Sequence, residues 1–185
     1  MTSAQTAAPD EATLVGRAKD GDIRAYEELV LRYQARMYRL AVRVLADRAD
    51  AEDVIQEVFL TAWRRLDQLE DEAAFVGWLY RMTTNRCLNV IRARRPRAEL
   101  DPETAASPHT DTWPEHAVQV SSQLGALTAA LETLTPEQRA CWLLREVDGL
   151  SYEEIADAVG AGPAAVRGRI ARARAQLSEV MEPWR

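Results

Sequence analysis

Arginines gathered in two short segments are the residues of this sequence best suited to chemistry, and that chemistry is binding of phosphates or base edges. Residues 81–97 hold six arginines and no acid, and residues 163–177 hold four arginines and no acid. A guanidinium forms paired hydrogen bonds with a phosphate or a guanine edge. The 185-residue chain has a net charge of −6, so everything outside these two segments carries −16. Two arginine-rich segments in an acidic chain favour localised contacts to phosphates or guanine edges, and the composition bias of a GC-rich genome is an equally good explanation of the preference for arginine over lysine.

Residues typical of a catalytic, metal or cofactor site are not arranged in a recognisable pattern. The sequence contains no nucleophile–base constellation, no glycine-rich phosphate loop and no cluster with metal-ligand spacing. Cys87 and Cys141 belong to no CxxC pair and are expected to be buried free thiols. His109 and His116 lie in an acidic segment without a recognised ligand set. We therefore expect a protein that is not an enzyme and that needs no metal or cofactor.

Apolar residues recur at spacings of three and four along the first half of the chain, which predicts a bundle of helices. One predicted apolar face runs from Ile23 to Val44, a second from Ala51 to Leu69, and a third begins near Phe75. Alternation typical of strands does not occur, so the fold class is predicted to be all-α. The predicted first domain covers residues 11–97, after a tail (residues 1–10) that lacks a signal-peptide pattern.

Residues 98–119 are predicted to form a flexible linker. Up to residue 117 this segment contains five acids and three prolines but no lysine or arginine, a composition that favours an extended chain over a packed one. The linker separates the first domain from a second one at residues 120–185. The sequence therefore predicts two small helical domains joined by an acidic, proline-containing linker.

The second domain contains two capping-box patterns, each of which predicts the start of a helix. Thr135 is followed three residues later by Gln138, and Ser151 is followed three residues later by Glu154. After the helix that Ser151 starts come a glycine-containing turn at residues 160–162 and a second, arginine-bearing helix. A short helix, a tight turn and a basic helix together predict a helix-turn-helix that places its second helix in the major groove.

Three stretches of the chain resemble the extracytoplasmic-function (ECF) group of the sigma-70 family of bacterial sigma factors. They contain the sequences DAEDVIQEVF (residues 50–59), GWLYRM (77–82) and GLSYEEIA (149–156), in the family's order and with an acidic segment before the third. The resemblance implies a cytoplasmic subunit that brings RNA polymerase core, through its β′ and β subunits, to promoter DNA and melts the minus-ten element. It also implies an anti-sigma factor as a further partner, and no contact with membranes.

The first stretch resembles the family's docking surface for the clamp coiled coil of the β′ subunit. Its polar side chains are expected to point away from the apolar positions of the same helix, toward a partner. The residues that the resemblance assigns to polymerase binding are Asp50, Glu52, Asp53, Gln56 and Glu57.

The second stretch resembles the element that opens and reads the minus-ten sequence, a task that needs stacking surfaces and positive charge. The residues assigned to it are Tyr80, Asn85, Arg86, Asn89, Arg92, Arg94 and Arg95. Trp78 shares an apolar spacing with Phe75 and Met82, which favours a core position over a stacking role. The preceding turn, residues 68–74, corresponds to the family's base-capturing loop.

The third stretch resembles the helix-turn-helix that reads the minus-thirty-five element. The residues assigned to DNA binding are Arg167, Gly168, Arg169, Ala171, Arg172 and Arg174. The chain departs from the family at Ala165 and Gly168, where threonine and serine are common. The loss of two hydroxyls predicts a less stringent or different upstream element.

A stand-alone helix-turn-helix regulator that binds DNA as a homodimer is the alternative hypothesis. Such a regulator needs a self-complementary surface and a ligand or signal domain, and the sequence indicates neither. The hypotheses differ in one testable respect, because only a sigma factor needs RNA polymerase in order to act at a promoter.

Overall fold

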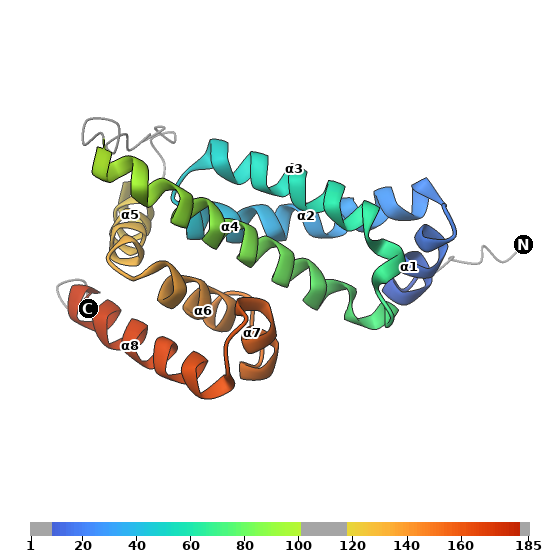
Figure 1. Cartoon of the computed structure of the whole chain (residues 1–185). Coiled ribbons are helices and arrows are strands. Elements are labelled where there is room, and N and C mark those ends of the chain that lie inside the picture. Colours follow the sequence, from blue (N-terminus) through green and yellow to red (C-terminus); the bar gives the residue numbers. More distant parts are fainter. Residues whose placement is uncertain (1–8, 101–117, 182–185) are drawn as a thin grey trace, which may run out of the picture.

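Helices make up the regular structure of the chain in a computed structural model that describes residues 9–100 and 118–181 (Figure 1). The predicted all-α fold class is confirmed for these residues. The helices are α1 (Glu11–Lys19), α2 (Ile23–Leu45), α3 (Arg48–Arg64), the short 3₁₀ helices η1 (Leu66–Gln68) and η2 (Glu72–Ala74), α4 (Phe75–Leu100), α5 (Val118–Glu132), α6 (Pro136–Glu146), α7 (Tyr152–Val159) and α8 (Pro163–Met181).

Aspartates begin the first three helices by capping their free backbone N–H groups. Asp10 accepts a hydrogen bond from the backbone N of Thr13 (2.8 Å), and Asp47 accepts one from the backbone N of Asp50 (2.9 Å). Asp22 accepts from two backbone N–H groups at the start of α2. Such caps satisfy donors that the helix itself leaves unpaired.

The core of the first half of the molecule, helices α1 to α4, differs at two points from the apolar faces that the sequence predicts. Ile23 is 62% exposed, because it is the first residue of α2, and burial begins at Ala25 and Leu29, where α1 packs. The second predicted face does not belong to a single helix, because α3 ends at Arg64 and the buried Leu66 and Leu69 follow in and after η1.

The second half of the molecule, helices α5 to α8, contains the predicted helix-turn-helix, formed by α7 and α8. Both capping boxes form, at Thr135 and at Ser151. Gly160 ends α7 with φ of 62°, a left-handed conformation that glycine adopts without steric cost. The apolar positions of α8 (Val166, Ile170, Ala173 and Leu177) are buried, which turns the opposite face of this helix outward.

The two halves pack against each other, with α7 lying on α4 and α6 lying on the C-terminal part of α2 (Figure 1). Apolar residues of both halves form one continuous core. Most of the predicted linker (residues 101–117) and most of the predicted tail (residues 1–8) lie outside the described residues. Helix α4 continues to Leu100 and α5 begins at Val118, so helix extends two or three residues into the predicted linker from each side.

A buried arginine of α6, Arg139, joins the two halves through backbone carbonyls. Its guanidinium donates to the carbonyl oxygens of Leu131 (2.8 Å) and Glu132 (3.1 Å) at the end of α5 and of Val44 (2.9 Å) at the end of α2. The carbonyls of a helix's last turn lack intrahelical partners and carry partial negative charge. Arg139 therefore caps one helix from each half at the same time.

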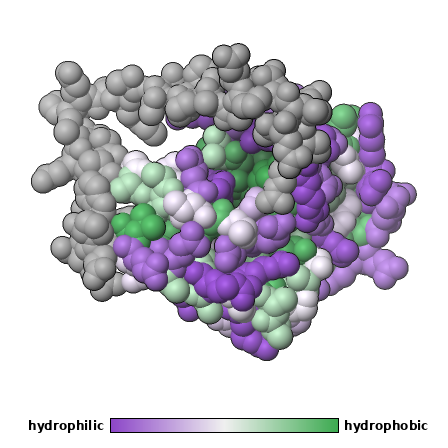
Figure 2. Space-filling view, turned by 60° about the vertical axis from the view of Figure 1, so that its left-hand side comes forward, coloured by the Kyte–Doolittle hydropathy of each residue, from purple (hydrophilic) through white to green (hydrophobic). Residues whose placement is uncertain are grey.

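The surface shown in Figure 2 is hydrophilic over most of its extent, with apolar residues in smaller patches between. Among the described helices, none combines the length and the apolar character needed to cross a membrane. Cys87 and Cys141 are free and buried, as the sequence predicts.

Candidate polymerase and nucleic-acid interface

The outer face of α3 presents the residues assigned to polymerase docking. Ala51, Val54, Val58 and Ala62 are buried against the rest of the first half, which places the intervening polar positions on the opposite side. The docking residues that are exposed are Glu52, Asp53, Gln56 and Glu57, whereas Asp50 is half-buried.

An exposed leucine, Leu60, extends this face and was not among the sequence-predicted residues. It is 50% exposed and follows Gln56 and Glu57 by four and three positions, which places the three side chains together on α3. Its signal in the sequence is that it falls outside the apolar stripe of its own helix. The outer face of α3 is therefore acidic with one apolar side chain among the charges.

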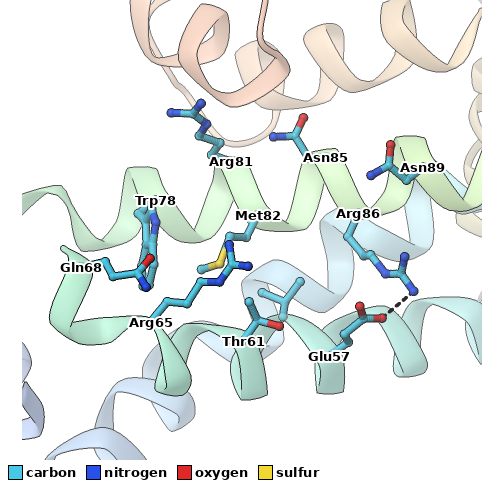
Figure 3. A pocket seen from close by; sticks show the side chains of 11 residues that line it. Glu57, Thr61, Arg65, Gln68, Trp78, Arg81, Met82, Asn85, Arg86 and Asn89 are labelled. Atoms are coloured by element: carbon cyan, nitrogen blue, oxygen red, sulfur yellow. Dashed lines mark ion pairs between the residues drawn. The ribbon is translucent and has the colours of Figure 1, made fainter.

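A groove of about 420 Å³ lies between α3 and α4 and gathers stacking, amide and cationic groups in one place (Figure 3). Gln68 and Trp78 lie at one end, and Glu57 and Arg86 face each other at the other end. The remaining residues that line it are Val58, Thr61, Arg65, Arg81, Met82, Asn85 and Asn89. An aromatic ring beside amides and guanidinium groups is suited to stack an unpaired base, read its edge and hold its phosphate.

Three of the seven residues assigned to the minus-ten element line this groove: Asn85, Arg86 and Asn89. Arg92 lies beyond it, donating to the side-chain oxygen of Asn89 (3.2 Å) and pairing with Glu137 of α6 (3.7 Å). Arg94 pairs with Asp50 of α3. Arg95 belongs to α4, but its side chain lies outside the described part of the structure.

Tyr80 is placed differently from the other residues assigned to the minus-ten element. Its side chain is only 2% exposed, and its hydroxyl donates to a carboxylate oxygen of Asp148 in the second half (2.8 Å). Arg36 completes the contact, donating to Asp148 and lying over the tyrosine ring. Burial and the neighbouring Asp148 carboxylate raise the pKa of Tyr80, so its hydroxyl stays protonated and keeps donating. A contact between Tyr80 and DNA therefore requires that the second half leave α4.

Four residues that line the groove were not among those that the sequence assigned to binding. They are Thr61, Arg65, Arg81 and Met82. Arg81 carried a usable signal, because it precedes Asn85 and Asn89 by four and eight positions and so shares their helix face. Thr61 belongs to α3 and Arg65 directly follows it, and only the packing of α3 against α4 brings them to the groove. Trp78, for which a core position was favoured, is half-buried and also lines the groove.

The outward face of α8 carries most of the residues assigned to the minus-thirty-five element. Arg167, Ala171, Arg172 and Arg174 are exposed, while Gly168 and Arg169 are half-buried. The guanidinium of Arg167 lies 5.9 Å from the ring centre of Tyr152 on α7. Arg174 forms an ion pair with Glu146 of α6 (2.5 Å). The exposed face of α8 is thus basic and bears small side chains, which allow a close approach to a groove.

The described residues contain no group of three histidine, cysteine or acidic side chains able to hold a metal ion. The two histidines of the predicted linker, His109 and His116, lie outside that part of the chain. Burial raises the pKa of Cys87 to about 12, and burial also raises the pKa of Cys141, an effect that the neighbouring Arg169 partly opposes.

Comparisons with known proteins match both halves of the chain separately. Residues 29–97 match the family model for sigma-70 region 2, and residues 124–177 match the model for sigma-70 region 4. The first match contains α3, most of α4 and the groove, and the second contains the helix-turn-helix. Together the two models match more than half of the chain.

The curated relatives that the chain matches are also RNA polymerase sigma factors. The chain is 42% identical over 160 residues to the ECF RNA polymerase sigma factor SigE of Mycolicibacterium smegmatis, a match covering 85% of this chain and 62% of that protein. It is 36% identical over 179 residues to the RNA polymerase sigma-H factor of Pseudomonas aeruginosa (92% and 93% of the two chains). It is 34% identical over 182 residues to the ECF RNA polymerase sigma-E factor of Escherichia coli K12 (94% and 95%).

Solved structures give the same fold. CnrH, solved in complex with the cytosolic domain of CnrY, superposes with a TM-score of 0.70 at 25% identity, covering 94% of this chain and 97% of that one. The sigma factor RpoE of Bartonella quintana, solved with the anti-sigma factor NepR, superposes with a TM-score of 0.72 at 23% identity, covering 85% and 96%.

The chain matches sigma-70 regions 2 and 4 in the expected order, on an all-helical fold with a basic helix-turn-helix. These features define a transcription initiation factor. The chain belongs to the sigma-70 family and, within it, to the ECF group of RNA polymerase sigma factors. Proteins of this family act by binding polymerase and DNA rather than by catalysing a reaction.

Proposed function

We propose that the chain binds RNA polymerase core through the outer face of α3, holds the opened minus-ten strand in the groove between α3 and α4, and places α8 in the major groove of the minus-thirty-five element. The groove is the observation that carries this proposal. It joins Trp78 to Asn85, Asn89 and three arginines, directly beside the acidic face of α3. A surface for polymerase and a surface for single-stranded DNA on adjacent helices are what promoter opening requires.

Each part of the groove has a role in holding a strand. Trp78 offers a ring on which an unpaired base stacks, and such stacking contributes about 1–3 kcal/mol per base. Asn85, Asn89 and Gln68 have amide groups that hydrogen-bond the edge of a base. Arg65, Arg81 and Arg86 supply charge for the phosphates, which sets affinity and its dependence on salt rather than sequence preference.

The helix-turn-helix supplies the second contact to the promoter. Arg167 and Arg172 are exposed on α8 and suit base edges or the adjacent phosphates, whereas Arg174 lies toward the flank. Gly168 gives this face a position without a side chain where the family commonly has a hydroxyl. The upstream element is therefore read mainly through arginine.

Promoter binding by both halves at once requires that they separate. In the closed arrangement α7 lies on α4, with Tyr80 and Asp148 bonded between them. An anti-sigma factor is a partner suited to holding this arrangement. CnrH, which resembles 94% of this chain at 25% identity, was solved with the cytosolic domain of CnrY.

Binding of core polymerase to a charge-reversal variant tests the docking face. Asp53→Lys should weaken binding to sigma-free core about tenfold or more, because a like charge placed in a complementary interface costs several kcal/mol. Glu27→Lys, the same reversal at an exposed position of α2, is the matched control and should bind like the wild type. Equal affinity of the two variants would show that the outer face of α3 is not the docking surface.

The alternative of a stand-alone helix-turn-helix regulator accounts for the second half only. It leaves the region 2 match and the groove between α3 and α4 without a role. Tight binding of duplex promoter DNA by the chain alone, without polymerase, would favour it.

A further inference from the structure

Two of the carboxylates assigned to polymerase docking are paired with two of the arginines assigned to DNA binding. Glu57 of α3 forms an ion pair with Arg86 of α4 (2.6 Å), and Asp50 of α3 pairs with Arg94 of α4. Asp47, the cap of α3, also lies 3.7 Å from Arg94. The two proposed binding surfaces thus share these ion pairs across the contact between α3 and α4. Figure 3 shows the pair formed by Glu57 and Arg86.

An arginine in such a pair is a poor partner for DNA. The carboxylate occupies the donors that a phosphate would use and repels the phosphate's charge. Arg86 lines the groove beside Glu57, so a strand entering the groove meets both charges at one end. The free chain therefore presents less positive charge to DNA than its arginine count indicates.

The pairs are also weak enough to be exchanged. The side chains of Arg86 and Glu57 are 43% and 50% exposed, and ion pairs at such positions stabilise a fold by only about 0–1 kcal/mol. A basic group of a partner protein that approaches Glu57 competes for its carboxylate at little cost. Removal of the carboxylate from Arg86 leaves the guanidinium free to turn toward a phosphate.

We propose that Glu57 and Asp50 restrain Arg86 and Arg94 in the free chain, and that docking of basic polymerase groups onto these carboxylates releases Arg86 to promoter DNA and loosens Arg94, which Asp47 and the carbonyl oxygen of Leu45 still contact. This inference rests on the proposed function, since it assigns the same carboxylates to docking. It adds that they have a second role as positioning residues for the DNA-binding arginines. Docking and DNA binding are then coupled through an exchange of ion-pair partners.

Glu52 and Asp53, unlike Glu57 and Asp50, are not paired with any arginine that the structure describes. They are exposed on α3, and none of the ion pairs found in the described residues involves them. They therefore serve docking alone under this proposal.

Thermodynamic linkage also requires that DNA strengthen the binding of polymerase by the same factor by which polymerase strengthens the binding of DNA.

Binding of a fluorescently labelled single-stranded oligonucleotide to the full chain, without polymerase and at low salt, tests the restraint. Glu57→Gln should bind about two- to fivefold more tightly than the wild type, the size expected on release of one exposed ion pair. The dependence of log K on log salt should steepen by about 0.7, which corresponds to one additional phosphate contact. Glu27→Gln removes the same charge from an exposed position of α2 and should leave the slope unchanged.

A second variant separates the release of Arg86 from a general change of charge. In an Arg86→Gln background, Glu57→Gln should gain clearly less affinity than it does in the wild-type background and should leave the salt slope unchanged, because the arginine to be released is absent and only the repulsion by the carboxylate is removed. Persistence of the full gain in that background would overturn the proposal. So would equal affinities and slopes for Glu57→Gln and Glu27→Gln, or no measurable binding by Glu57→Gln. These outcomes leave the proposed function standing, which fails instead if the wild-type chain does not bind core polymerase.

Discussion

The hydroxyl of Tyr80 on α4 donates a 2.8 Å hydrogen bond to the carboxylate of Asp148, and this bond ties the first half of the molecule to the second. Asp148 lies in the turn between α6 and α7, and Arg36 of α2 donates to its side chain (3.1 Å) and to its carbonyl oxygen (2.9 Å). A carboxylate held by two groups of the other half is a specific contact between the halves. It adds a specific polar contact to the apolar packing between the halves.

Removal of the Tyr80 hydroxyl should shift the molecule toward open forms. Tyr80→Phe removes a hydrogen bond with a net contribution of about 0.5–1.5 kcal/mol, and small-angle X-ray scattering should then give a larger radius of gyration. Tyr26→Phe is the matched control, because the Tyr26 hydroxyl donates to the carbonyl of Phe59 within the first half. An unchanged radius for Tyr80→Phe, or an equal increase for both variants, would refute this role of the contact.

Much of the fold follows from local signals in the sequence, because helix starts and apolar spacing act over a few residues. Both capping boxes, the turn at Gly160 and the buried face of α8 form as predicted. Ile23 was wrongly expected to be part of a buried face, since burial of the first turn depends on where α1 packs. The contacts of Arg139 were not predictable, because its partner Val44 lies 95 positions away.

The candidate site was predicted only in part, because the sequence reveals neighbours within one helix but not contacts between elements. Asn85 and Asn89 share a helix face that spacing reveals, and the structure places both of them in the groove together with Arg86. The pairing of Glu57 with Arg86 joins two helices, and that of Tyr80 with Asp148 joins a helix to the turn between two others. No spacing within one helix encodes such pairs, so the restraint on Arg86 and the burial of Tyr80 emerge only from the fold.

Gly168 of α8 should be replaceable by alanine with a gain in stability. A Cβ at this position would lie 3.4 Å from the nearest atom, the guanidinium of Arg172, which is the end of a flexible side chain. Glycine inside a helix costs up to about 1 kcal/mol relative to alanine, so thermal or urea unfolding of Gly168→Ala should show an increase approaching that size. A loss of stability would mean that the position is closed to any side chain.

The capping box at the start of α7 should make stability depend on pH. Hydrogen bonds from Ser151 lower the pKa of Glu154 below its ordinary value of 4.5. A carboxylate with a lowered folded-state pKa stabilises the fold at pH values above its unfolded pKa, and that contribution is lost as the pH falls through the folded pKa.

Comparison of the wild type with Glu154→Gln measures this contribution. Urea unfolding at neutral pH should show the wild type to be more stable, and the difference should close as the pH falls below the folded-state pKa of Glu154. The box at Thr135 uses the neutral Gln138 in place of a carboxylate and should add no pH dependence. A difference that persists unchanged in strong acid would contradict the assignment.

Neither cysteine should react with an alkylating reagent while the protein is folded. Cys87 and Cys141 are buried, and burial raises the pKa of both thiols, to about 12 for Cys87. The reactive thiolate is therefore scarce at neutral pH. Mass spectrometry after iodoacetamide treatment should find both cysteines unmodified in buffer and modified in denaturant. Rapid labelling of the folded protein would instead indicate an accessible, redox-sensitive thiol.

In vitro transcription by a defined mixture asks directly whether the chain acts as a sigma factor. The purified chain is added to sigma-free bacterial core polymerase with genomic DNA of the source organism, and the 5′ ends of the transcripts are mapped. We expect discrete start sites that share two upstream sequence elements at a fixed spacing and that are absent with core polymerase alone. Transcripts no different from those of core alone, together with tight promoter binding by the chain without polymerase, would contradict this expectation.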